Sequence, residues 1–162
     1  MNEIDLTHIR QLRMAGEHEA AQSELVRLAA EYPQDPLVQY ETACVHDFLG
    51  LERAAVPFYH AALAYGLAGE ERRSAYLGLG STYRALGEYE NSAAVFAEGL
   101  AHFPEAAELR LFLAMTQYNL GQARQAVSAL LHLLAESSAD PFVQQYGRAI
   151  RFYADDLDAV YE

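Results

Sequence analysis

Residues 74–104 read SAYLGLGSTYRALGEYENSAAVFAEGLAHFP, two helix-like apolar runs on either side of Gly87. Glycine enters the left-handed region cheaply at a helix C-terminus, so Gly87 marks where one helix stops and the chain turns back. The small Ser92 follows five residues later, and the large Phe96 four residues after that. A small side chain lets two antiparallel helices approach to about 8–10 Å, and a large one packs a turn further along the same face. The stretch therefore predicts a helical hairpin.

The same arrangement occurs four times in all along the chain. Its turn glycines are separated by 34, 37 and 34 residues and are Gly16, Gly50, Gly87 and Gly121. The small and large residues at the two offsets are Ala21 and Leu25, Ala55 and Tyr59, Ser92 and Phe96, and Ala126 and Leu130. Repetition near this period is typical of stacked helical hairpins, because one hairpin cannot bury its apolar face without a neighbour. The sequence therefore predicts an all-α fold.

We expect a single domain of about nine helices. Its four hairpins are expected at about residues 2–35, 36–72, 73–106 and 107–140, and a final helix at 141–162. The final helix has apolar residues on one face at helical spacing, namely Phe142, Tyr146, Ala149, Ile150, Tyr153, Leu157 and Val160. Charged and amide residues share the opposite face. We therefore expect the apolar face to cover the open end of the fourth hairpin as a cap.

The stretch 74–104 closely resembles the tetratricopeptide repeat. The motif positions hold Tyr76, Leu79, Gly80, Tyr83, Ser92, Phe96, Gly99 and Pro104. The resemblance implies a right-handed superhelix of about four such hairpins plus the capping helix, in which the first helix of each hairpin lines a concave face. Over about residues 36–158 the chain also resembles a family of small bacterial cytoplasmic tetratricopeptide proteins. This narrower resemblance implies a dimeric tendency and brings no known ligand or catalytic residue.

The composition disfavours several classes of partner and compartment. A net charge of -12, from 23 acidic and 11 basic residues, would repel nucleic acids and anionic membrane surfaces. Cys44 is the only cysteine, which excludes a disulfide within the chain and suits a reducing compartment. The first residues are acidic where a signal peptide would be basic, and no apolar run reaches the roughly 18 residues of a spanning helix. We therefore expect a cytoplasmic protein. All eleven basic residues are arginine, which with the heavy alanine usage fits a GC-rich bacterial genome.

No group of residues has the spacing of a catalytic or metal site. The six histidines form no H-x-x-x-H or H-E-x-x-H pattern, and the neighbours His46 and Asp47 point about 100° apart on a helix. The segment 78–81, GLGS, lacks the GK[ST] ending of a phosphate loop and lies inside a predicted helix. Cys44 has no arginine close in sequence to lower its pKa, which indicates a shielded structural thiol. We therefore expect no enzyme, no catalytic residue, no metal and no cofactor.

The remaining candidate site is the concave face that the resemblance implies. Its inward positions hold aromatic, methionine and arginine side chains, which are enriched at interface cores and hot spots. The candidate partner-binding residues are Arg10, Arg13, Tyr40, Asp47, Arg84, Tyr118 and Asn119. Packing against the neighbouring repeat is the alternative role for each of them.

Two functions fit this fold. The leading hypothesis is a non-catalytic protein–protein interaction module that binds a peptide or partner protein, of unidentified kind, on the concave face. The alternative is a self-associating structural or regulatory subunit whose groove or cap forms a homodimer. A measurement of the molecular mass in solution separates the two.

Overall fold

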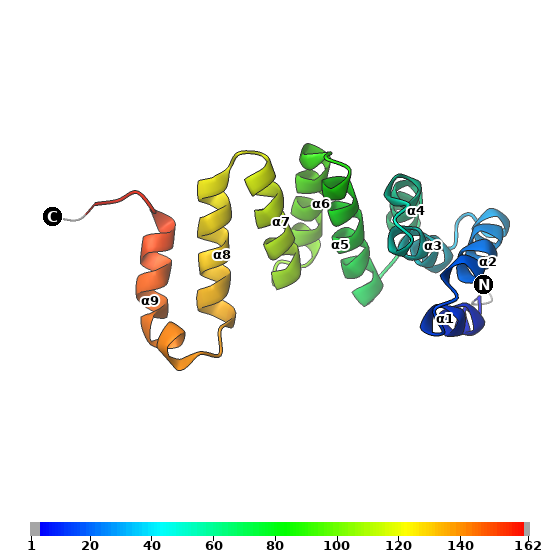
Figure 1. Ribbon diagram of the computed structural model, residues 1–162, viewed down its shortest axis with the longest axis horizontal. Helices are drawn as coiled ribbons and strands as arrows, with labels where there is room; N and C mark the ends of the chain where they lie inside the picture. Colours follow the sequence, from blue (N-terminus) through cyan, green and yellow to red (C-terminus); the bar gives the residue numbers. More distant parts are fainter. Residues whose placement is uncertain (1–3, 161–162) are drawn as a thin grey trace. The chain divides into compact units, whose positions relative to one another are not determined.

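The computed structural model describes residues 4–160, shown in Figure 1. Over this range the chain forms nine α-helices and no β-strand, which confirms the predicted all-α fold. The helices are α1 (Thr7–Met14), α2 (His18–Glu31), α3 (Pro36–Phe48), α4 (Glu52–Ala64), α5 (Gly69–Ala85), α6 (Tyr89–His102), α7 (Ala107–Asn119), α8 (Ala123–Ser137) and α9 (Pro141–Asp155). The four turn glycines stand between α1 and α2, α3 and α4, α5 and α6, and α7 and α8.

Each of these glycines adopts the left-handed conformation predicted for it, with φ between +71° and +82°. The residue after each glycine donates its backbone N–H to the carbonyl five residues earlier. Glu17 does so to Leu12, and Glu88 to Tyr83, both at 2.9 Å. These bonds satisfy carbonyls at the helix C-terminus that have no partner inside the helix. Local chemistry at the glycine therefore ends the first helix of each hairpin.

Two helices, α3 and α9, begin with the same Asp-Pro pair. Asp35 accepts hydrogen bonds from two backbone N–H groups of α3, at 2.9 and 3.0 Å. Asp140 does the same in α9, at 2.8 and 3.1 Å. The proline stands at the first helical position, where a missing N–H costs little. By this start, α9 resembles the first helix of a hairpin.

The chain divides into two compact units. The first ends at Glu88 and contains α1 to α5, and the second begins at Tyr89 and contains α6 to α9. In the first unit, α2 packs against α1 and α3, and α3 also packs against α4 and α5. In the second unit, α7 packs against α6 and α8, and α8 packs against α9. That the whole chain forms one domain, with the repeat bounds given above, stays a prediction.

The small and large residues after each glycine pack largely as predicted. All four small ones, Ala21, Ala55, Ser92 and Ala126, are buried. The large one is buried in three hairpins, but Leu130 on α8 is 38% exposed. In the first unit, Phe58 of the following hairpin packs against the cluster that contains Leu25. Within residues 4–160, α9 is the helix that packs on α8 after it in the chain, and it leaves Leu130 partly exposed.

The packed face of α9 is not the one that the sequence predicts. Gly147 and Ala154 are its buried residues, whereas Phe142, Tyr146 and Tyr153 are exposed. Small side chains let α9 approach α8 closely, and the bulky rings lie beside this contact instead of in it. The prediction that these aromatic residues cover the fourth hairpin is therefore wrong.

The last helix is also shorter than predicted. It ends at Asp155, so Leu157 and Val160, which were expected on its apolar face, lie beyond it and are exposed. Residues 161 and 162 of the predicted helix lie outside the described range.

Candidate functional site

The predicted partner-binding residues all lie on the first helices of hairpins. In the first unit they are Arg10 and Arg13 on α1, Tyr40 and Asp47 on α3, and Arg84 on α5; in the second unit they are Tyr118 and Asn119 on α7. Two of these residues, Arg13 and Asp47, line one pocket of the first unit. Tyr40 and Arg84 are half-buried and do not line it, and in the second unit Tyr118 is exposed.

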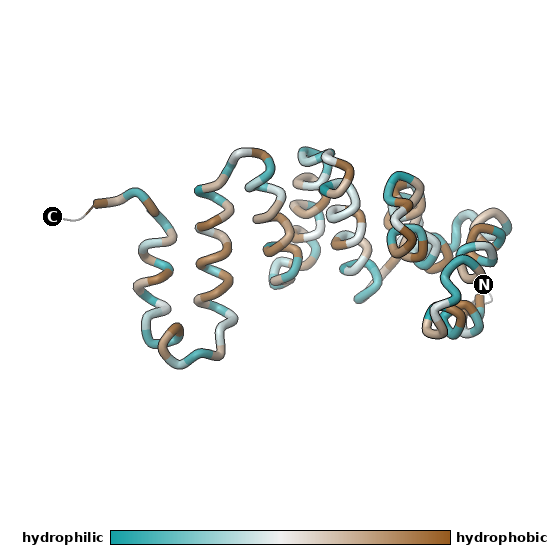
Figure 2. The backbone as a smooth tube through the Cα atoms, in the orientation of Figure 1, coloured by the Kyte–Doolittle hydropathy of each residue, from teal (hydrophilic) through white to brown (hydrophobic). Residues whose placement is uncertain are grey.

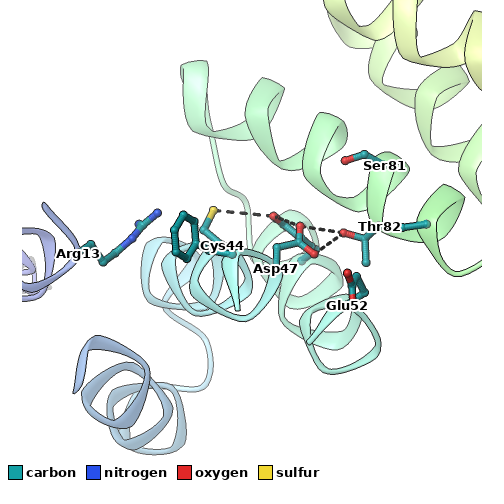
Figure 3. A pocket seen from close by; sticks show the side chains of 9 residues that line it. Arg13, Cys44, Asp47, Glu52, Ser81 and Thr82 are labelled. Carbon is teal, nitrogen blue, oxygen red and sulfur yellow. Dashed lines mark hydrogen bonds between the residues drawn. The ribbon is translucent and has the colours of Figure 1, made fainter. Parts of the chain in front are cut away.

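The pocket has a volume of about 480 Å³ and is drawn in Figure 3. Arg13 of α1 lies on one side of it and Thr82 of α5 on the other, with Cys44 and Asp47 of α3 between them (Figure 3). Glu52, the first residue of α4, also lines the pocket. Four helices therefore contribute, and the packing of α3 against α4 and α5 brings three of them together.

Asp47 joins three helices of the first unit. Its carboxylate accepts a hydrogen bond from the hydroxyl of Tyr59 on α4 at 2.9 Å, and the hydroxyl of Thr82 on α5 lies 2.8 Å from both carboxylate oxygens. Burial raises the pKa of the Asp47 carboxyl and outweighs the two hydroxyl contacts, which lower it. Burial likewise raises the pKa of Tyr59, so its hydroxyl stays a donor. The pocket wall thus contains a partly desolvated acidic group held by neutral donors.

Replacing Asp47 with asparagine is expected to change how stability depends on pH. Because folding raises the pKa of this carboxyl, the folded state binds its proton more tightly than the unfolded state does. The contribution of this carboxyl to stability therefore falls as the pH rises from its unfolded pKa, about 3.9, through the higher folded pKa. The asparagine variant lacks this loss. Urea denaturation from about pH 4 to 7 should show its free energy of unfolding rising relative to wild type; a relative fall would contradict the shift.

Glu41 explains the position of the two predicted arginines on α1. Its side chain on α3 is only 7% exposed, and one carboxylate oxygen accepts a hydrogen bond from Arg10 Nε at 3.0 Å. The other oxygen pairs with Arg13 Nη1. The carboxylate thus links α1 to α3 and neutralises one of the two positive charges at the edge of the pocket. Arg10 and Arg13 therefore have a structural role.

Replacing Glu41 with glutamine is expected to lower the free energy of unfolding by about 1–2 kcal/mol, since two charge-assisted hydrogen bonds are weakened. Both guanidinium groups keep contact with water, so the cost stays below that of breaking a fully buried pair. Urea denaturation measures it. The control is Glu31→Gln, which removes the exposed Glu31–Arg27 pair within α2 and should cost less than about 0.5 kcal/mol. Equal losses of unfolding free energy in the two variants would show that the Glu41 ion pairs stabilise the fold no more than an exposed pair does.

Phe48 presents an aromatic ring at the same pocket. It is the last residue of α3, is 64% exposed, and stacks on His18 of α2 with 3.8 Å between ring centroids. It also lines an adjoining pocket with the exposed Met14. An apolar surface therefore continues from the acidic pocket toward α1 and α2.

Sequence reasoning missed several residues of the pocket. Tyr59 is predicted only as a packing residue, and neither Thr82 nor Glu52 is a candidate. They reach the pocket from α4 and α5 through contacts between residues far apart in the sequence. Asp47 and Thr82, for example, are 35 positions apart. No local pattern signals such pairings in one sequence.

The thiol of Cys44 is half-buried, and burial raises its pKa, which disfavours the reactive thiolate. Within residues 4–160, no three His, Cys, Asp or Glu side chains are grouped as a metal site. None of the helices in this range is long and apolar enough to cross a membrane.

The helical hairpins match a known family. A family model described as Tetratrico peptide repeat matches residues 36–157, from the start of α3 to just past the end of α9. Comparison with curated proteins finds no match. Repeat proteins of this kind use the surface formed by successive repeats to bind other proteins. Because the matched residues make up well over half of the sequence, the chain belongs to the tetratricopeptide repeat family.

Proposed function

We propose that this protein is a non-catalytic protein–protein interaction module whose first-unit pocket receives a segment of a partner protein. One observation carries the proposal: the exposed ring of Phe48 stands beside the carboxyl groups of Asp47 and Glu52 at one pocket. Exposed aromatic side chains near a few placed polar groups are typical of interface hot spots. This combination suits a segment with an apolar side chain next to a basic one.

The charges around the pocket support a basic segment. Arg13 shares the carboxylate of Glu41 with Arg10, so these three groups together leave about one positive charge against the two carboxyl groups of Asp47 and Glu52. Asp47 accepts from two neutral hydroxyl groups, which leave its own negative charge uncompensated when it is ionised. The net charge of -12 adds a long-range attraction for basic partners.

The other predicted residues extend the proposed contact surface within each unit. In the first unit they are Arg10, Tyr40 and Arg84, and in the second Tyr118 and Asn119. We further propose a cytoplasmic location in a bacterial cell, since a reducing compartment keeps the single Cys44 as a thiol.

Selection of binders from a random peptide library displayed on phage tests this function. Immobilised wild-type protein should enrich peptides that place lysine or arginine next to an apolar residue, and salt should weaken their binding. Phe48→Ala and Asp47→Asn should each reduce affinity for these peptides at least tenfold. Tyr65→Ala, at an exposed tyrosine after α4 that does not line the pocket, is the matched control. Acidic peptides, or peptides that bind the Phe48 variant equally well, would refute the proposal.

A second candidate function is self-association. The exposed aromatic side chains of α9 favour the cap of the chain over its groove as the contact surface. This candidate does not compete with the first, because the pocket lies in the first unit and α9 in the second.

A further inference from the structure

The last two helices, α8 and α9, have a large exposed apolar surface. On α9, Phe142 is 72% exposed, Tyr146 59% and Tyr153 54%. On α8, an aliphatic row is between 38% and 46% exposed and consists of Val127, Leu130 and Leu134. Figure 2 shows apolar residues along the length of α8 and at intervals along α9. We call these six residues the C-terminal apolar face.

The two rows lie on the same side of the α8–α9 pair. His132 of α8 and Asp155 of α9 form an ion pair at 3.0 Å, which marks one side of the contact between the helices. At about 100° per residue, the exposed row of each helix points away from the residue that forms this pair. On α9 the buried Gly147 and Ala154, which mark the contact with α8, lie between Asp155 and the exposed row, so the ion pair and the row flank this contact on opposite sides. Both rows therefore lie on the side of the α8–α9 pair that is opposite the ion pair.

This face corresponds to the position of a further helix in the repeat. The helix α9 begins with the Asp-Pro start of α3, the first helix of its hairpin. In the first unit, the second helix of that hairpin, α4, supplies Phe58 to the cluster around Leu25. Leu130 holds the position of Leu25 in the fourth hairpin and, among the described residues, stays 38% exposed where Leu25 is fully buried. The C-terminal apolar face is thus the surface on which a helix paired with α9 would pack.

We propose that a second copy of this chain occupies the C-terminal apolar face, with the two α9 helices packed antiparallel about a two-fold axis. The proposal rests on the second proposed function, self-association, and adds the surface and its symmetry. A closed two-fold contact uses the same patch on both copies, so a single apolar face suffices.

The exposed area is sufficient for a stable dimer. At about 150–250 Å² per aromatic side chain, the three rings on α9 expose roughly 400 Å². With the aliphatic row of α8, the face reaches roughly 600 Å² per copy, so the dimer would bury about 1,200 Å², the lower limit for stable complexes. An apolar face of roughly 600 Å² is at the upper end of the range for the largest patch on a soluble monomer, and patches of this size are often functional.

The order of residues on α9 suits a two-fold contact. Ala149 lies at the middle of the exposed row, with Tyr146 one turn before it and Tyr153 one turn after it. A small residue at the centre lets two helices cross closely, and Tyr146 of each copy then lies near Tyr153 of the other. The row itself contains no charged residue, which matters because two copies with net charge -12 repel one another elsewhere.

Sedimentation of the full chain tests self-association and its surface separately. Wild type should have twice the 18.0 kDa mass of one chain at micromolar concentration, and Tyr146→Glu should have the mass of one chain with an unchanged helical spectrum. The matched control Tyr65→Glu, at an exposed tyrosine of the first unit, should stay dimeric. A monomeric wild type would overturn self-association altogether. A dimer that survives Tyr146→Glu would overturn only the proposed surface.

Oxidative crosslinking tests the two-fold arrangement. In a Cys44→Ser background, Ala149→Cys should form a disulfide-linked dimer rapidly, because the axis brings the two copies of residue 149 within reach of each other. Ala94→Cys, at an exposed alanine of α6, is the control and should remain monomeric on a denaturing gel. Equal crosslinking of the two variants, or none at residue 149, would overturn the antiparallel packing of α9.

Discussion

Replacing Phe96 with alanine is expected to lower the free energy of unfolding by about 3–5 kcal/mol. The ring of Phe96, on α6, is completely buried, and its centroid lies 6.3 Å from that of Phe112 on α7. Alanine would leave a cavity between these helices and remove the contact between the rings. Urea denaturation followed by helical circular dichroism measures the loss. The control, Phe48→Ala, removes an exposed ring and should cost less than about 1 kcal/mol; equal midpoints for the two variants would contradict the packing described for α6 and α7.

The same variant tests whether the chain is one domain. Phe96 belongs to the second unit, whereas the helices α1 to α5 belong to the first. If the chain unfolds as a single cooperative domain, hydrogen exchange in Phe96→Ala should accelerate by similar factors at the most protected amides of α3 and α7. Acceleration confined to α6–α9 would show two units that unfold separately and would contradict the predicted single domain.

The sequence predicts those features of the fold that depend on local chemistry. Each of the four turn glycines needs only its own left-handed conformation and the N–H of the next residue to end a helix. These requirements are set within about six residues, so they can be recognised in one sequence. The positions of the buried small residues follow from the same repeat, as Ala21 and Ser92 show.

The orientation of α9 shows where such reasoning fails. Spacing alone identifies a broad apolar arc on this helix, which includes Phe142 and Tyr146 as well as Ile150. It does not say which part of the arc meets α8. The close approach at Gly147 and Ala154 decides this, because the bulky rings cannot enter a tight helix contact.

The candidate site could be predicted only in part. The motif position places Asp47 on a first helix, where the structure has it at the pocket. Its hydrogen bonds to Tyr59 and Thr82 depend on how α4 and α5 pack, which no local pattern specifies. The pairing of Arg13 with Glu41 likewise joins residues 28 positions apart. Tertiary contacts of this kind decide whether the side chain of a predicted binding residue joins two helices or stays available to a partner.

The segment GLGS at residues 78–81 provides the last example, because its first glycine is required by packing and not by phosphate chemistry. Gly78 lies inside α5, and a Cβ atom added there would stand within 2.8 Å of the hydroxyl oxygen, Cζ and Cε1 of Tyr59. The Tyr59 ring is buried, and its hydroxyl donates a hydrogen bond to Asp47. The ring therefore cannot move aside without breaking that hydrogen bond.

Gly78→Ala is therefore expected to lower the free energy of unfolding by about 1–5 kcal/mol. Overpacking costs about 1–3 kcal/mol, and loss of the buried Tyr59–Asp47 hydrogen bond costs about 1–3 kcal/mol more. The higher helix propensity of alanine offsets about 1 kcal/mol of this.

The matched control is Gly147→Ala in α9, where the nearest atoms lie 3.6 Å or more from the added Cβ. That variant should be neutral or more stable by up to about 1 kcal/mol, because only the gain in helix propensity remains. Urea denaturation of both variants, and of Gly78→Ala combined with Tyr59→Leu, measures the coupling between the two positions. If the tyrosine ring is the obstacle, the double variant should be less destabilised than the sum of its single changes. Additive effects would show instead that Gly78 is needed for some other reason than its contact with Tyr59.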